Sequence, residues 1–81
     1  MAITYPALID GEPGAFGVVF PDVAGIGAMG ATVDEALGNA KAVLIGYAIE
    51  MERDGLPLAA PSRLEVISVP QGNQLTSVTV N

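Results

Sequence analysis

The chain has 81 residues, of which 51% are hydrophobic, and nine acidic side chains against three basic ones give a formal net charge of −6. This length predicts a single domain with a thin core. Three cations do not supply the clustered Lys and Arg that nucleic-acid phosphates require, so the composition argues against nucleic-acid binding by this segment. The acidity suits either a basic protein partner or simple solubility.

The sequence contains no cysteine and no histidine. It therefore has no disulfide framework, and it lacks the commonest general base and the commonest metal ligands. The N-terminus has neither the basic region nor the apolar run of a signal peptide. The longest apolar run is far shorter than a membrane span. We expect a cytoplasmic protein with no cofactor, no metal and no membrane partner.

The first part of the chain predicts three strands. Residues 2–9 alternate between apolar and other side chains, which is typical of a half-buried strand. Residues 10–14 are rich in Gly and Pro and predict a hairpin loop longer than the tightest type. A second strand is expected over 15–20, where a proline ends it, and a short third strand over 26–31.

Residues 25–30 match the dinucleotide-binding pattern G-x-G-x-x-G letter for letter. That pattern requires a glycine turn that opens from a parallel strand into a helix of a βαβ unit. Here the preceding strand belongs to a predicted antiparallel hairpin, and the chain is too short for a dinucleotide domain. We therefore interpret these glycines as part of the third strand and its connection.

A long helix is predicted over residues 33–53. Thr32 and Glu35 have the spacing of a capping box, and Gly55 is placed to end the helix. A broad apolar stripe at helical spacing predicts the face that packs on the sheet. This stripe consists of Val33, Ala36, Leu37, Ala40, Val43, Leu44, Tyr47, Ala48 and Met51.

Prolines make residues 56–62 an extended connector. A strand is expected over 63–69, then a turn, then a possible last strand over 75–80. Residues 1–81 are thus interpreted as one α+β domain of two layers with the order β-β-β-α-β(-β). Its small antiparallel or mixed sheet carries one helix packed on one face.

The carboxylates do not predict a catalytic site. Two-metal nucleases need several inward carboxylates on adjacent elements. Here Asp10 and Glu12 fall in a turn, Asp34 and Glu35 in a helix cap, and Glu65 alone in a predicted strand. We expect no catalytic residue and no enzymatic activity.

Partner binding is predicted instead on one flank of the helix and at the sheet edges. With Leu44 at the centre of the core stripe, Ile45 and Ile49 lie on its flank, next to Lys41 and Glu52. This flank is interpreted as ordinary exposed surface or as a contact for a second subunit or another protein. The open edges of a small sheet, and the segment 75–80 in particular, favour a homodimer or higher oligomer.

An ordered set of short motifs adds a family resemblance. The motifs are Tyr5-Pro6-Ala7, Gly17-Val-Val-Phe20-Pro21-Asp22 with Gly25, Ala31-Thr-Val-Asp-Glu-Ala-Leu37 with Asn39-Ala40, Asp54-Gly55 with Pro57, and Pro61-Ser62. In this order and spacing the chain resembles HicB-like antitoxins of HicAB toxin–antitoxin pairs over roughly residues 3–69. The resemblance implies a partial ribonuclease-H-like sheet with one helix across it.

The resemblance also implies a function. HicB-like antitoxins bind and neutralise HicA, a small basic ribonuclease, and carry a C-terminal DNA-binding segment that represses the operon. Nothing after residue 69 resembles such a segment, so direct DNA binding by this chain is not expected. The corner at Asp22 is interpreted as structural or as a further partner contact. The alternative function is an orphan oligomeric scaffold or small-ligand-binding domain of the same fold.

Overall fold

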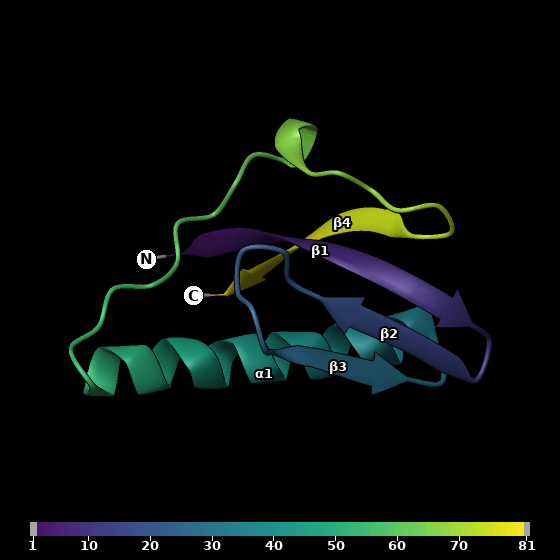
Figure 1. Ribbon diagram of the computed structural model, residues 1–81. Helices are drawn as coiled ribbons and strands as arrows, with labels where there is room; N and C mark the ends of the chain where they lie inside the picture. Colours follow the sequence, from purple (N-terminus) through teal and green to yellow (C-terminus); the bar gives the residue numbers. More distant parts are fainter. Residues whose placement is uncertain (1, 81) are drawn as a thin grey trace.

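The computed structural model describes residues 2–80, and a four-stranded sheet forms its centre (Figure 1). Every pair of neighbouring strands is antiparallel, in the order β3-β2-β1-β4. The strands are β1 (Ile3–Glu12), β2 (Ala15–Val19), β3 (Gly27–Gly30) and β4 (Gln74–Val80). One helix, α1 (Val33–Arg53), packs across one face. The α+β two-layer fold predicted from the sequence is confirmed.

Local side-chain and backbone chemistry sets both ends of α1. At its start, the Thr32 hydroxyl accepts a hydrogen bond from the Glu35 N–H (3.1 Å), and the Glu35 carboxylate accepts one from the Ala31 N–H (2.9 Å). At its end, Gly55 has a φ of +68°, and the N–H groups of Gly55 and Leu56 donate to carbonyls of the last turn. The helix therefore has the bounds expected from the sequence.

The hairpin between β1 and β2 is tighter than expected. β1 continues to Glu12, which pairs with Ala15, so that only Pro13 and Gly14 form the loop. Gly11 permits this, because its φ is +97° and a Cβ there would lie 2.1 Å from the Ala15 carbonyl oxygen. The expectation of a longer loop is therefore wrong.

The prediction of a strand over residues 63–69 is also wrong. Leu64–Val66 form a short 3₁₀ helix, η1, and the rest of that segment has no regular structure. The place beside β1 is occupied by β4, the possible last strand of the sequence analysis, with a register from Ile3↔Val80 to Ile9↔Gln74. An alternating apolar pattern indicates a half-buried segment, but it does not determine which of two such segments pairs with β1.

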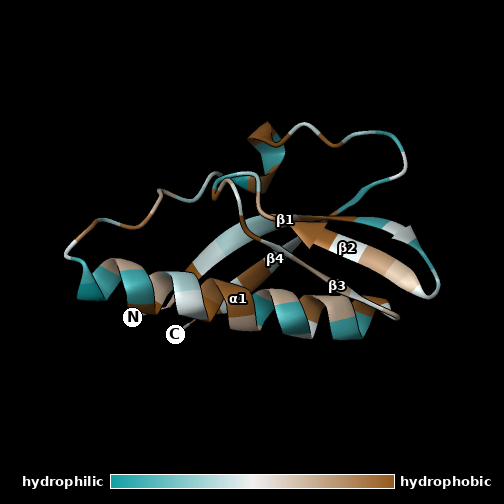
Figure 2. Ribbon diagram, turned by 60° about the horizontal axis from the view of Figure 1, so that its bottom comes forward, coloured by the Kyte–Doolittle hydropathy of each residue, from teal (hydrophilic) through white to brown (hydrophobic). Residues whose placement is uncertain are grey.

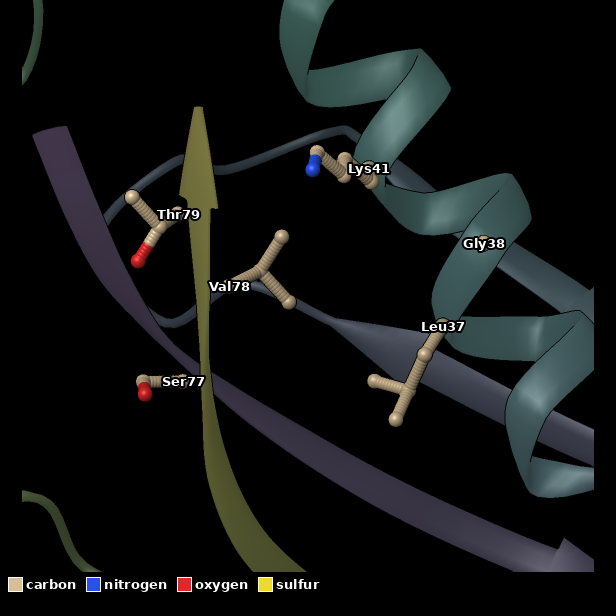
Figure 3. Close-up of a pocket in the computed structure, with 6 residues that line it drawn as sticks. All are labelled: Leu37, Gly38, Lys41, Ser77, Val78 and Thr79. Atoms are coloured by element: carbon tan, nitrogen blue, oxygen red, sulfur yellow. The ribbon is translucent and has the colours of Figure 1, made fainter. Parts of the chain in front are cut away.

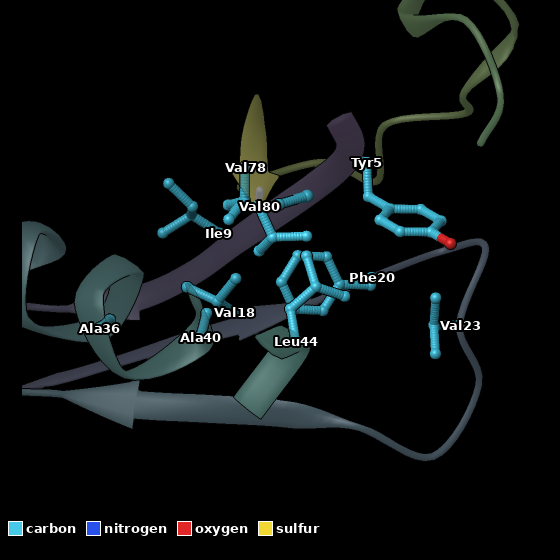
Figure 4. Packing of buried hydrophobic residues seen from close by; sticks show 11 residues of the cluster. Tyr5, Ile9, Val18, Phe20, Val23, Ala36, Ala40, Leu44, Val78 and Val80 are labelled. Atoms are coloured by element: carbon cyan, nitrogen blue, oxygen red, sulfur yellow. The ribbon is translucent and has the colours of Figure 1, made fainter. Parts of the chain in front are cut away.

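The core lies between the sheet and α1 (Figure 4). Leu44, the predicted centre of the helix stripe, is fully buried, whereas Val43 at the rim of that stripe is 37% exposed. Burial of one such leucine contributes about 1.5–3 kcal/mol. The core cluster comprises Tyr5, Ala7, Ile9, Val18, Phe20, Val23, Ala36, Ala40, Leu44, Val78 and Val80.

The opposite face of β1 is covered as well. Pro6 and Leu8 alternate with the core residues of β1, so they face away from α1, yet both are buried. The whole segment between α1 and β4, residues 54–73, is called the connector from here on. It includes η1 and passes on that side of the sheet (Figures 1 and 2). This long connector therefore acts as a thin third layer over the centre of the sheet.

Candidate functional site

The helix flank that the sequence singled out is exposed in the structure. Ile45 is 39% exposed and Ile49 is 59% exposed. Lys41 and Glu52 are exposed at either end of this pair. Because the four residues follow one another at intervals of three or four, they share one side of α1. The result is an apolar pair framed by a cation and an anion, which we call the α1 flank.

The α1 flank continues into an open groove beside β4 (Figure 3). This groove has a volume of about 340 Å³ and is lined by Leu37, Gly38, Lys41, Ser77, Val78 and Thr79. Lys41 thus belongs to both surfaces. In Figure 3 the Val78 side chain points toward α1, whereas Ser77 and Thr79 point to the other face of the sheet. No local sequence pattern indicates this groove, because it depends on the position of β4 beside β1.

The opposite flank of α1 forms a second groove against the loop before β3. Its volume is about 480 Å³, and its lining residues are Ile26, Val43, Gly46, Tyr47, Glu50 and Met51. Most of this lining is apolar. Glu50 is the only charged residue among those that line it.

The C-terminal end of α1 is negative. Glu50, Glu52 and Asp54 are all exposed there. Arg53 lies 3.8 Å from Asp54 and offsets only one of these three negative charges, so the region remains negative. The helix dipole adds further negative potential at this end. A basic surface would be attracted to it.

Asp22 makes its visible contacts inside the chain. Its two carboxylate oxygens accept hydrogen bonds from the Ser62 N–H and the Ser62 hydroxyl, each at 2.7 Å. This double hydrogen bond ties the corner after β2 to the connector, forty positions later in the chain. The structural interpretation of the corner accounts for Asp22, and its role as a partner contact stays a prediction.

Two tyrosines hold the connector at Ala59, three residues before Ser62. The Tyr5 hydroxyl donates to the Ala59 carbonyl (2.5 Å), and the Ala59 N–H donates to the Tyr47 hydroxyl (2.9 Å). Burial, and then the nearby Tyr47, raise the pKa of the Tyr5 phenol above its usual value. The neutral phenol is a hydrogen-bond donor here, and its bond to Ala59 fixes the connector to the start of β1.

No cluster of metal-binding side chains occurs within residues 2–80. Asp10 lies in β1 and not in the predicted turn, and Glu65 lies in η1 and not in a strand. Asp22 lies in the corner after β2 and Asp34 in the first turn of α1, so these carboxylates occupy separate parts of the fold. In the same described range, no helix is long and apolar enough to cross a membrane.

Comparison with known proteins identifies a family. Residues 5–80 match a family described as "HicB_like antitoxin of bacterial toxin-antitoxin system". No curated protein sequence matches the chain.

Several solved structures share the fold. The N-terminal domain of Burkholderia pseudomallei antitoxin HicB is 23% identical, with a TM-score of 0.81 over 98% of this chain and 99% of that one. A HicA3–HicB3 toxin–antitoxin complex contains a similar chain at 25% identity and a TM-score of 0.73, covering 93% of this chain and 94% of that one. A chain of a toxin–antitoxin complex from Streptococcus pneumoniae, 21% identical, gives a TM-score of 0.87 over all of this chain and 70% of that one.

The larger HicB structure from B. pseudomallei is 24% identical, with a TM-score of 0.84 over 98% of this chain. The present chain spans 64% of the length of that protein.

Proposed function

Since the chain belongs to the HicB-like antitoxin family of bacterial toxin–antitoxin systems, we propose that it binds a small basic HicA-like toxin in the cytoplasm and neutralises it. The family match over residues 5–80 carries this proposal. The similar chains found in toxin–antitoxin complexes support it. The mechanism is occlusion: the antitoxin covers the RNA-cleaving surface of the toxin and needs no catalytic chemistry of its own.

We assign the toxin contact to the α1 flank. Exposed Ile45 and Ile49 offer an apolar centre, and Glu52 lies beside them at the negative end of the helix. Interfaces place most of their binding energy in a few central apolar anchors, and opposite charges at the rim accelerate and orient the encounter. Asp22 contributes indirectly in this proposal, because it holds the connector in place.

Self-association and DNA binding are separate from the toxin contact. We propose that the chain self-associates as a dimer or tetramer, because a single thin core gains stability from association. DNA binding and operon repression are not assigned to these residues, because the chain has only three cations. They would require a separate DNA-binding segment.

The test uses co-expression with a HicA-like toxin encoded beside this gene. We expect rescue from the toxin's growth arrest and co-purification of the two proteins. Ile49→Lys should weaken toxin binding by about tenfold or more, because it places a cation against a basic partner. Val66→Lys is the matched control, since Val66 is similarly exposed (62%, against 59% for Ile49) but lies on the connector.

The outcomes separate the candidate functions. Absence of both complex and rescue would contradict the antitoxin role and favour an orphan scaffold or small-ligand domain. Equal binding by the Ile49 and Val66 variants would leave the antitoxin role intact but refute the assigned surface. Toxin affinity measured by calorimetry distinguishes these results.

A further inference from the structure

The outer edge of β4 is the least protected part of the sheet. Among residues 2–80, nothing pairs with it. The strand has seven residues, Gln74–Val80, without a charge or a proline. Natural sheets usually protect such edges with Lys, Pro, bulges or a covering segment, because an open edge invites another strand.

The other edge of the sheet differs in each respect. β3 has only four residues, two of which are glycines. The carbonyl of Met29 accepts a hydrogen bond from the Asn39 side chain (2.8 Å), so part of that edge is already occupied. The sheet therefore has one short, partly covered edge and one longer, open edge.

The register shows which groups of β4 point outward. Ser77 lies opposite Pro6, which has no N–H and cannot form a hydrogen-bonded pair there. The bonds to β1 must then run through the alternate residues, Val78 and Thr76. Ser77 and Thr79 consequently direct their backbone N–H and C=O groups away from β1, toward the open edge.

We propose that this edge pairs with β4 of a second copy of the chain. The pairing is antiparallel about a two-fold axis near Val78, and it joins the two four-stranded sheets into one. Ser77 of each copy lies opposite Thr79 of the other, giving about four inter-chain backbone hydrogen bonds. The inference adds a surface to the self-association proposed above and does not depend on toxin binding.

The charges beside the edge fit a second copy of the chain. Lys41 lies beside the edge, in the lining of the groove. Asp34 precedes Lys41 by seven residues, so it lies on the same side of α1. A two-fold axis makes the two helices antiparallel on one face, which brings Lys41 of one copy toward Asp34 of the other. Gly38, beside which a Cβ would meet nothing within 4 Å, leaves room for this approach.

Ser77→Pro is the direct test. It removes one outward N–H while the ladder with β1 keeps its hydrogen bonds, and proline is tolerated on edge strands. Ser77→Ala is the control, because it retains the N–H. Light scattering after size exclusion should give twice the mass of one chain for the parent and for Ser77→Ala. It should give the mass of a single chain for Ser77→Pro. Circular dichroism should show that all three remain folded.

Two further variants test the edge pairing independently, in case Ser77→Pro does not fold. Gly38→Gln introduces a better helix former and should also give single chains, because its side chain fills the approach between helices. Val78→Cys gives the chain its only cysteine. Oxidation should cross-link it into a dimer, because directly opposed residues of a non-hydrogen-bonded pair lie within disulfide reach.

Each outcome decides a different point. A parent that remains a single chain at all concentrations would overturn the edge pairing together with self-association. A dimer that persists in both Ser77→Pro and Gly38→Gln would overturn the edge pairing while self-association stands. Loss of toxin affinity in Ser77→Pro, without a change in mass, would assign the edge to the toxin and overturn the proposal.

Discussion

Replacement of Asp22 by Ala should destabilise the fold without removing a partner contact. The half-buried carboxylate accepts two hydrogen bonds from Ser62, both at 2.7 Å. Hydrogen bonds to charged groups contribute about 1.5–3 kcal/mol each, with the lower end appropriate for partly solvated groups. Allowing for water that replaces part of the lost interaction, we expect Asp22→Ala to lower the free energy of unfolding by about 2 kcal/mol.

The partner residue provides the matched comparison. Ser62→Ala removes the hydroxyl donor but keeps the backbone N–H, so it should cost about 1 kcal/mol. The double variant should be less destabilised than the sum of the two single variants, because both remove the same hydroxyl–carboxylate bond. For a domain of this size, a loss of 2 kcal/mol lowers the melting temperature by about 8–16 °C.

Urea denaturation followed by circular dichroism measures these differences, and calorimetry with the toxin measures binding. Folded Asp22→Ala should bind the toxin with the affinity of the parent. The reasoning fails if Asp22→Ala is within about 0.5 kcal/mol of the parent, or if it loses toxin affinity while its stability is unchanged.

Three further predictions concern the core, the glycines and pH. Leu44→Ala should cost about 3 kcal/mol in urea denaturation, since Leu44 is fully buried. Gly30→Ala should destabilise by about 2 kcal/mol, because its Cβ would lie 2.4 Å from the Ala36 nitrogen; Gly46→Ala, with nothing within 4 Å, should stabilise by up to about 1 kcal/mol. The raised pKa of Tyr5 stabilises the fold below the usual tyrosine pKa of about 10, and this contribution is lost as the pH rises through the folded-state pKa. Tyr5→Phe should therefore lose less stability than the parent between pH 8 and pH 11, in the same assay.

The sequence predicted those features that depend on neighbouring residues. The capping residues Thr32 and Glu35 determine the start of α1 through local hydrogen bonds, so the helix could be placed accurately. The exposed pair Ile45 and Ile49 followed from helical periodicity about Leu44. Each of these predictions required only the geometry of a single element.

Features that depend on distant partners could not be predicted in the same way. The strand expected over 63–69 has a suitable alternating pattern, yet β4 takes the place beside β1. The groove beside Lys41 exists only because β4 lies there. The hydrogen bonds between Asp22 and Ser62 join segments forty positions apart, and no local pattern indicates such a contact.

The connector links these distant features. It is held at Ala59 by two tyrosines and at Ser62 by Asp22, close to the end of β2. It must then cross to the other edge of the sheet before β4 begins at Gln74. The residues that cross pass over the face of β1 that carries Pro6 and Leu8, and apart from η1 they have no regular structure before β4 (Figure 1). The same path leaves β4 at one end of the four-stranded sheet, where its outer edge is open among residues 2–80.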